Sequence, residues 1–153
     1  MLLSVAYARR VTLGELPDWA QAMLESEHVA RLAYLDGDDL PRVLPVVFAI
    51  AEDTVWGVID TKPKRTPEPA RVRWLRRRPE VAFCVDVYDD EWERLAWVQL
   101  LGSVSLLDLA DRPAAVEALQ ARYPQYRERT PPGPLLRLDL ERALWWRIAD
   151  YRD

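Results

Sequence analysis

Residues 54–66 read TVWGVIDTKPKRT, and the rest of the chain is organised around this stretch. Residues 54–59 are apolar and rich in β-branched and aromatic side chains, a composition that predicts a strand. Residues 67–78, PEPARVRWLRRR, predict a helix with Thr66 as its N-cap and Pro67 at its first position. The turn between strand and helix carries three cations, Lys62, Lys64 and Arg65.

Such a turn can bind an anion, because backbone N–H groups, the positive end of a helix dipole and long cationic side chains meet there. The alternative is a solvated basic turn without a ligand. The concentration of positive charge in a chain of formal net charge −4 favours the anion site. The sequence has neither a GxGxxG nor a GxxxxGK[ST] loop, so a bound phosphate would depend on side-chain cations and a helix start.

Composition excludes several classes of protein. The 153 residues are half hydrophobic and 30% charged, which predicts one globular domain over 1–153. The net charge argues against general nucleic-acid binding. Cys84 is the only cysteine and His28 the only histidine, so neither a disulfide framework nor a metal site rich in Cys or His is expected. His28 is expected to be structural or exposed, and no metal is predicted.

No window approaches the roughly 20 apolar residues of a membrane span. Residues 1–6 are too short for the apolar core of a signal peptide, and the charges of Arg9 and Arg10 follow them instead of preceding them. We therefore expect a cytoplasmic protein with no membrane partner.

The first half of the chain predicts a helix and three strands. Leu16, Trp19, Ala20, Met23 and Leu24 recur at helical spacing within residues 15–27. Three apolar runs separated by short turns then predict an antiparallel meander, with strands at 29–35, 42–50 and 54–60. Pro45, inside the second run, requires an edge position, a bulge or a break in the ladder.

The second half predicts two long strands, a helix and a final strand or bent strand pair. The strands span 81–88 and 95–107, the helix opens at 111–113 and ends near Tyr123, and the last run covers 135–140 and 143–149. Gly102 predicts a bulge or bend in the second long strand. Cys84 is expected to be a small core residue. The arginines near the end of the 67–78 helix suit its dipole and by themselves indicate no function.

The predicted fold is α+β and mainly β: about six mostly antiparallel strands in a closed or partly closed barrel with helices at its ends. Seven tryptophans exceed what a small barrel interior can hold. We expect some of them in a dimer interface or against a planar ligand, with these four as the candidates: Trp92, Trp97, Trp145 and Trp146.

Three motifs occur together in this order: RVLPVVF at 42–48, VIDTKPKRT at 58–66 and VDVYDDEWERLAWVQLLG at 85–102. Their combination resembles the pyridoxamine 5′-phosphate oxidase-like superfamily, the FMN-binding split barrels. Within it the chain is most similar to the probable deazaflavin (coenzyme F420)-dependent oxidoreductases. The resemblance covers about residues 27–107. It implies a split β-barrel that forms a homodimer, with two cofactor sites in the clefts between the subunits.

The resemblance also implies roles for individual residues. The cofactor phosphate would be bound by Lys62, Lys64, Arg65 and Thr66. The cofactor ring would be lined, largely by backbone groups, by these residues: Leu44, Pro45, Val46, Val47, Ile59 and Asp60. Trp97 and Gln99 would approach it from the other subunit, and Trp145 and Trp146 are weaker candidates for the cleft wall. Relatives commonly carry a tryptophan and an arginine where this chain has Ala96 and Gln99, which weakens the attraction for a polyanionic tail.

The implied activity is hydride transfer from a bound deazaflavin to an unknown small-molecule acceptor. In such enzymes the cofactor carries the chemistry, which agrees with the lack of a nucleophile–base pair in this sequence. An FMN enzyme of the same fold and a non-catalytic flavin- or haem-binding protein remain as alternatives. Tyr88 is a possible proton donor, although a core or interface tyrosine is the simpler interpretation.

Overall fold

The structure, a computed structural model, describes residues 10–60 and 68–151. The predicted phosphate-binding residues lie outside this range: Lys62, Lys64, Arg65 and Thr66. Its elements, in chain order, are η1 (Leu13–Glu15), α1 (Asp18–Ser26), β1 (Ala30–Leu35), β2 (Pro41–Val46), β3 (Ala49–Ala51), β4 (Thr54–Val58), α2 (Ala70–Arg77), β5 (Glu80–Val87), η2 (Trp92–Arg94), β6 (Ala96–Leu107), η3 (Leu109–Asp111), α3 (Pro113–Arg122), α4 (Gln125–Glu128), β7 (Leu135–Arg147) and η4 (Ile148–Tyr151).

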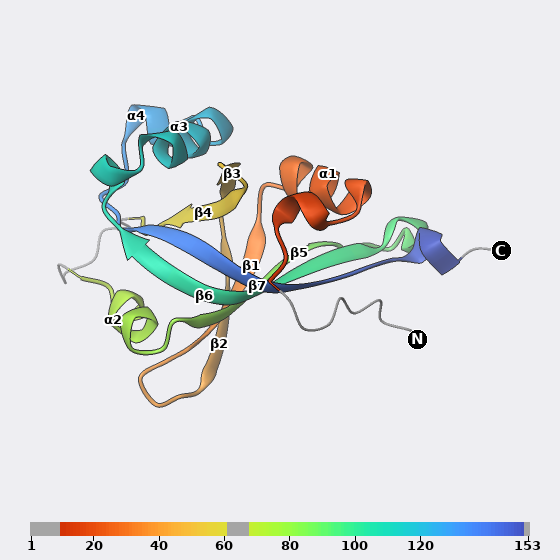
Figure 1. The fold of residues 1–153 in the computed structure, drawn as a ribbon, viewed down its shortest axis with the longest axis horizontal. Coiled ribbons are helices and arrows are strands. Elements are labelled where there is room, and N and C mark those ends of the chain that lie inside the picture. Colours follow the sequence, from red (N-terminus) through yellow and green to blue (C-terminus); the bar gives the residue numbers. More distant parts are fainter. Residues whose placement is uncertain (1–9, 61–67, 152–153) are drawn as a thin grey trace.

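Seven strands form one sheet in the order β2-β1-β5-β6-β7-β4-β3, and every pair of neighbours is antiparallel. The two edge strands, β2 and β3, follow each other in the chain and are linked by only Val47 and Phe48. The sheet must therefore curl until its edges approach each other (Figure 1). This arrangement is a barrel that is left open between β2 and β3, and it confirms the predicted mainly β fold of antiparallel strands with flanking helices.

The predicted meander is wrong, because the 42–50 run is two strands at opposite edges of the sheet. Phe48, where the run divides, is fully buried and its ring packs edge-on against Phe83 at 5.1 Å. Its N–H donates to the Tyr123 hydroxyl at 3.0 Å, and its carbonyl accepts from that hydroxyl at 2.7 Å and from Arg122 at 3.2 Å. Because these bonds replace ladder bonds, the chain can leave one edge and join the other.

The prediction for Pro45 is confirmed. Pro45 is exposed and lies in β2, opposite Arg31 of β1, at the edge of the sheet. No further strand pairs with the free side of β2 among the described residues, so the missing N–H of proline costs no ladder bond there.

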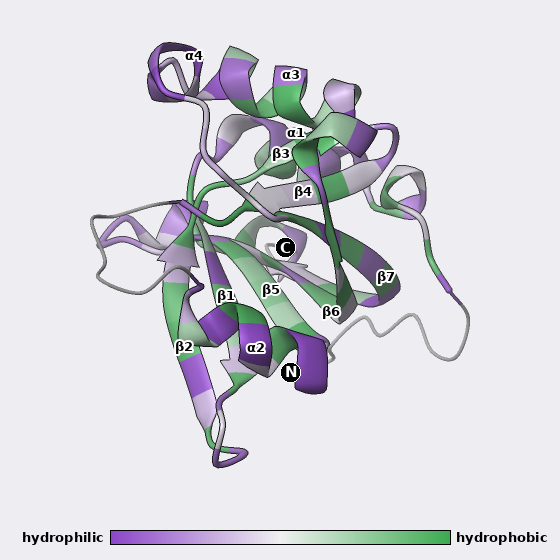
Figure 2. Ribbon diagram, turned by 90° about the vertical axis from the view of Figure 1, so that its left-hand side faces the viewer, coloured by the Kyte–Doolittle hydropathy of each residue, from purple (hydrophilic) through white to green (hydrophobic). Residues whose placement is uncertain are grey.

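Two hydrophobic clusters fill the molecule. The larger joins α1 and α2 to the inner face of the sheet, and the smaller joins α3 and α4 to β3, β4 and the start of β7. Figure 2 shows α3 and α4 beside β3 and β4 at one end, with α2 at the other. The burial of Ala20, Met23 and Leu24 confirms the expected face of α1, and α3 buries Ala115 and Leu119.

The bulge expected at Gly102 is present, since the register of β6 against β7 shifts between Leu101 and Gly102. A Cβ atom at Gly102 would collide with the Asp139 carbonyl oxygen, so only glycine lets the two backbones approach this closely. On the partner strand Glu141 has no opposite residue in the register. The last strand is therefore one bent strand and not a pair.

Helix α2 begins at Ala70 with Pro69 in the N-cap position, three residues later than predicted. Thr66 and Pro67 are therefore not its N-cap and first residue. Pro69 explains the difference, because proline disfavours the helical conformation in the residue before it, here Glu68. The helix buries Val72 and Leu75, and Trp74 is partly buried.

The expectation that Cys84 is a core residue is also wrong. Along β5 the buried side chains are Val81, Phe83 and Val85, so Cys84 lies half-buried on the opposite face of the sheet. Partial burial raises the pKa of the Cys84 thiol, and the nearby carboxylate of Asp86 raises it further. Within the described residues, no helix is both long enough and apolar enough to cross a bilayer.

Candidate functional site

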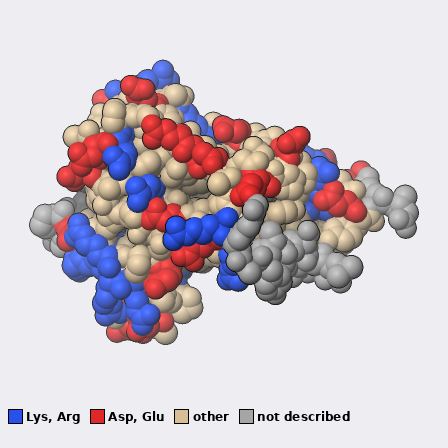
Figure 3. Space-filling model, in the orientation of Figure 1, with Lys and Arg blue, Asp and Glu red and all other residues tan. Residues whose placement is uncertain are grey.

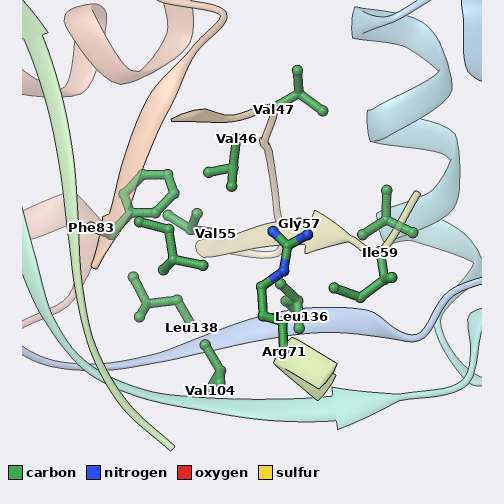
Figure 4. A pocket seen from close by; sticks show the side chains of 12 residues that line it. Val46, Val47, Val55, Gly57, Ile59, Arg71, Phe83, Val104, Leu136 and Leu138 are labelled. Atoms are coloured by element: carbon green, nitrogen blue, oxygen red, sulfur yellow. The ribbon is translucent and has the colours of Figure 1, made fainter. Parts of the chain in front are cut away.

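A cavity opens into the barrel where its two edges approach each other (Figure 4). Its wall is formed by side chains and backbone from all the strands except β3, with α2 at one side. The centre of a water-sized sphere can occupy about 40 Å³ of it, and the described residues that line it are all apolar or glycine apart from Arg71. The described part of its wall is thus apolar, with the Arg71 cation beside it.

Three of the predicted ring-contacting residues meet at this cavity. Val46 ends β2, Val47 follows it, and Ile59 follows β4, yet all three line the same space. Ile59 is held by its N–H, which donates to the Pro134 carbonyl at 3.0 Å. Among the described residues, none forms a hydrogen bond with the backbone N–H or C=O of Val47.

The other three predicted ring contacts are not brought to the cavity. Leu44 is partly buried and packs against the larger hydrophobic cluster. Pro45 is exposed one residue further along the same strand. Asp60 is exposed beyond the end of β4, where its charge adds to burial in raising the pKa of Tyr126 to about 12.

The cavity wall at Val46 and Val47 is held in place through the adjacent Phe48. Tyr123 and Arg122, at the end of α3, bind the backbone of Phe48 as described above, and the Arg122 guanidinium lies 4.5 Å from the centre of its ring. Arg122 also donates to the carbonyls of Leu24 and Glu25, at 3.2 and 3.0 Å, and of Glu27. Burial raises the pKa of Tyr123, so its hydroxyl stays protonated at neutral pH. Arg122 and Tyr123 thus hold the connection between β2 and β3 (the crossover) against the end of α1.

Arg71 is the residue of this site that sequence reasoning missed. It lies in the first turn of α2, and Figure 4 shows its side chain reaching from that helix toward β4 and the cavity. The helix dipole stabilises cations at the C-terminal end and opposes them at the N-terminal end. The dipole therefore accounts for the last arginines of α2 but not for Arg71, a distinction that the sequence contained.

Figure 3 shows Lys and Arg side chains gathered over α2 and the tip of the β1–β2 hairpin. At this tip Arg77 and Arg78 pair with Asp39, at 3.1 and 3.2 Å, and Arg77 also donates to the Gly37 carbonyl at 2.8 Å. Asp36 accepts hydrogen bonds from the N–H groups of Asp38 and Leu40, which lower the pKa of its carboxyl. These arginines fasten α2 to the hairpin.

Trp97 and Gln99 do not line the cavity of their own chain. They alternate along β6 with the buried Val98 and Leu100, so they lie on the outward face of the sheet. The expectation that they act from a second subunit therefore stays a prediction. Trp145 packs against the larger cluster, whereas Trp146 stacks on Tyr151 with 6.1 Å between ring centres. Tyr88 and Trp92 are exposed by 70% and 73%.

Over the described part of the chain, no group of three or more His, Cys, Asp or Glu side chains is arranged to hold a metal ion. The described residues that line the cavity include no serine, cysteine, histidine or carboxylate. The described lining is suited to binding an apolar or planar group near a cation.

No protein-family model matches the sequence, and a search of curated proteins found no match. Solved structures do match the fold. A heme binding protein from Mycobacterium smegmatis superposes with a TM-score of 0.67 at 16% identity, over 86% of this chain and 55% of that one. A FAD-binding protein from Mesorhizobium loti gives 0.63 at 19% identity, over 85% and 94%.

A protein from Clostridium acetobutylicum, described as related to general stress protein 26 and as belonging to the pyridoxinephosphate oxidase family, gives a TM-score of 0.62 at 16% identity. The match covers 85% of this chain and 87% of that one. Identities this low establish the fold and nothing finer. The chain therefore has the split-barrel fold of pyridoxine-phosphate-oxidase-like proteins.

Proposed function

We propose that the chain is a flavin-type cofactor-binding oxidoreductase that uses a deazaflavin, coenzyme F420, to transfer hydride to a small-molecule acceptor. One observation carries the proposal: Val46, Val47 and Ile59 lie together at the cavity although they come from two separate segments. The segment that carries the predicted phosphate-binding cations begins two residues after Ile59. One ligand could therefore place its ring at the cavity and its phosphate on that segment.

The residues present suit this cofactor. Val46, Val47 and Ile59 offer an apolar wall, and the backbone groups of Val47, which bond to no described residue, would bond the polar edge of a ring. Lys62, Lys64, Arg65 and Thr66 would bind the phosphate, and Trp97 and Gln99 would come from the second subunit of a homodimer. The bound cofactor supplies the hydride chemistry, so the protein's part is to bind, orient and exclude water.

Two alternatives differ from this proposal in the cofactor that the protein would bind or in how it would use it. FMN would occupy the same wall and the same cations. A non-catalytic flavin- or haem-binding protein is the second alternative. Two observations favour it: the described residues that line the cavity include no side chain that could act as a general acid, and the proteins that share the fold include one described as heme-binding.

The discriminating experiment is a binding screen of the purified protein against deazaflavin, FMN, FAD and haem, followed by spectroscopy. We expect saturable binding of deazaflavin and weaker binding of FMN. A haem Soret band without flavin binding would support the non-catalytic alternative. Binding of none of the four would refute the proposed site.

Replacing Lys64 or Arg65 by alanine tests the phosphate anchor. Each change should weaken cofactor binding by about 1–3 kcal/mol, the scale of a lost charge-assisted hydrogen bond. Arg129, an exposed cation beyond α4, provides the control, and Arg129→Ala should leave the affinity unchanged. Equal losses in all three variants would show that only overall charge matters, and the anchor would be wrong.

A further inference from the structure

Val47 meets the cavity with its backbone and not with its side chain. The side chain packs against the smaller hydrophobic cluster, and Figure 4 shows it pointing away from the centre of the cavity. A Cβ atom at Gly57 would lie 3.8 Å from the Val47 carbonyl oxygen. Both residues line the cavity, and no described residue donates a hydrogen bond to this oxygen. The wall thus presents a backbone acceptor where glycine places no side chain over it.

The direction of the Val47 carbonyl is set by a hydrogen bond on the other side of the same peptide group. This group joins the Val47 C=O to the Phe48 N–H, and in a planar trans peptide the two point in opposite directions. The Phe48 N–H donates to the Tyr123 hydroxyl at 3.0 Å. The Val47 carbonyl must therefore point away from Tyr123, which agrees with its place beside Gly57.

Tyr123 does not line the cavity, and it is held in place by contacts on several sides. It is buried directly after α3, and its ring packs edge-on against the rings of His28 and Tyr126, with 5.8 and 5.9 Å between ring centres. Its hydroxyl also lies 2.7 Å from the carbonyl oxygens of Phe48 and His28. Tyr123 therefore acts on a ligand of the cavity through the peptide group that joins Val47 to Phe48.

A carbonyl oxygen can only accept a hydrogen bond, so it selects a ligand edge that carries a donor. The other described residues of the wall are apolar or glycine apart from Arg71, so a flat ring with an N–H at its edge suits this wall. Flavins and deazaflavins present such an edge, an imide N–H between two ring carbonyls. The ring nitrogens of haem are bound to iron and carry no N–H. The contact therefore distinguishes flavin-type rings from haem.

We propose that Tyr123 is a positioning residue that aims the Val47 carbonyl at the imide N–H of a bound ring, and that Gly57 keeps this carbonyl accessible. The inference rests on the proposed function, because it places a ring at the wall formed by Val46, Val47 and Ile59. It goes further by assigning the choice of ring to a residue that does not touch the ring.

The experiment is a fluorescence titration of the purified protein with lumiflavin and with 3-methyl-lumiflavin, in which a methyl group replaces the imide hydrogen. Neither ring carries a phosphate, so the titration does not involve the predicted phosphate anchor. The parent should bind lumiflavin about tenfold more tightly, the effect of leaving an acceptor without its donor. Tyr123→Phe should reduce this preference to about twofold or less, because the peptide group is no longer held by the hydroxyl.

Gly57→Ala tests the second part of the proposal. The new methyl group would meet Leu136 and the Val47 carbonyl at ordinary contact distances of 3.7 and 3.8 Å, so β4 should keep its place. Because the methyl group covers the carbonyl, the preference for lumiflavin should again fall to about twofold or less.

Gly102→Ala is the matched control for a general loss of stability. Gly102 is not among the residues that line the cavity, and a Cβ there would collide with the Asp139 carbonyl oxygen, so this variant should be destabilised as Tyr123→Phe is. Its preference for lumiflavin should stay at about tenfold, since a ratio of two affinities does not depend on the fraction of folded protein. Circular dichroism at the titration temperature would verify that each variant is folded.

The proposal is overturned if the parent binds neither ring or binds both equally well, because no ring N–H then meets the Val47 carbonyl. A preference that survives in Tyr123→Phe would remove the positioning role, and one that survives in Gly57→Ala would remove the role of Gly57. A preference lost equally in Gly102→Ala would reduce the effect to general destabilisation.

The use of F420 is tested separately, by the cofactor screen. Failure of deazaflavin to bind, together with a clear preference for lumiflavin, would refute the proposed cofactor and leave the role of Tyr123 in place. Binding of deazaflavin without any such preference would do the reverse. The two failures are therefore distinguishable.

Discussion

The hydroxyl of Tyr123 offers a direct test of how the barrel is closed. It accepts a hydrogen bond from the N–H of Phe48 at 3.0 Å. It also lies 2.7 Å from the carbonyl oxygens of Phe48 and His28, and its single proton is donated to one of them at a time. Tyr123→Phe keeps the ring and removes all of these bonds. The Phe48 carbonyl retains Arg122, but its buried N–H is left without a partner.

A buried backbone N–H without a partner costs about 1–3 kcal/mol. For a chain of this size, a loss of that magnitude should lower Tm by roughly 2–12 °C. Urea unfolding of the variant and the parent would give the free energy directly, provided that the m value is unchanged. Exchange of the Phe48 amide with deuterium should also become faster.

Tyr34→Phe is the matched control. Tyr34 is equally buried and stacks on Trp74 with ring centres 6.3 Å apart, but its hydroxyl has no hydrogen bond to a described residue. Its loss should change stability by less than about 0.5 kcal/mol. If Tyr123→Phe were as mild as Tyr34→Phe, the crossover would not depend on this hydroxyl, and the proposed reason for the split of the 42–50 run would be wrong.

Two further predictions concern the sheet and the second buried tyrosine. Gly102→Ala should destabilise the protein by about 1–3 kcal/mol or more in the same urea assay, because the new methyl group overlaps the Asp139 carbonyl, and an unchanged midpoint would contradict the close approach at the bulge. Tyr126 should titrate near pH 12 by ultraviolet difference spectroscopy. Since its folded pKa lies above the usual value of 10.0, the parent should lose stability relative to Tyr126→Phe as the pH rises from 10 to about 12, and equal stabilities across that range would refute the shift.

Local chemistry in the sequence predicted much of the fold. The helical spacing around Ala20 and Met23, the edge position of Pro45 and the bulge at Gly102 each follow from a rule that involves one element or one pair of strands. The prediction of a meander was wrong, because the division at Phe48 depends on Tyr123 and Arg122, about 75 residues further along the chain. A long-range hydrogen bond leaves no local pattern in the run that it interrupts.

The candidate site was predicted only in part, because local sequence patterns do not show which distant residues meet. Val46, Val47 and Ile59 were placed by the resemblance of their motifs, and they meet at the cavity. Arg71 was grouped with the arginines that end α2, although its place in the first turn opposes the dipole argument used for them. Cys84 was assigned to the core from its apolar neighbours, whereas only the pairing of β5 with β1 and β6 decides which face of the strand is inward.

The sheet order also bears on how the protein is made. β4 lies between β3 and β7, so its second neighbour is a strand that begins 77 residues after β4 ends, at Leu135. Until β7 emerges during synthesis, β4 and β6 each expose an unpaired edge, and the barrel cannot close. Such non-local pairing slows folding and exposes edges on which other chains can add. Completion of this fold, and its protection from aggregation, therefore depend on the last strand to be synthesised.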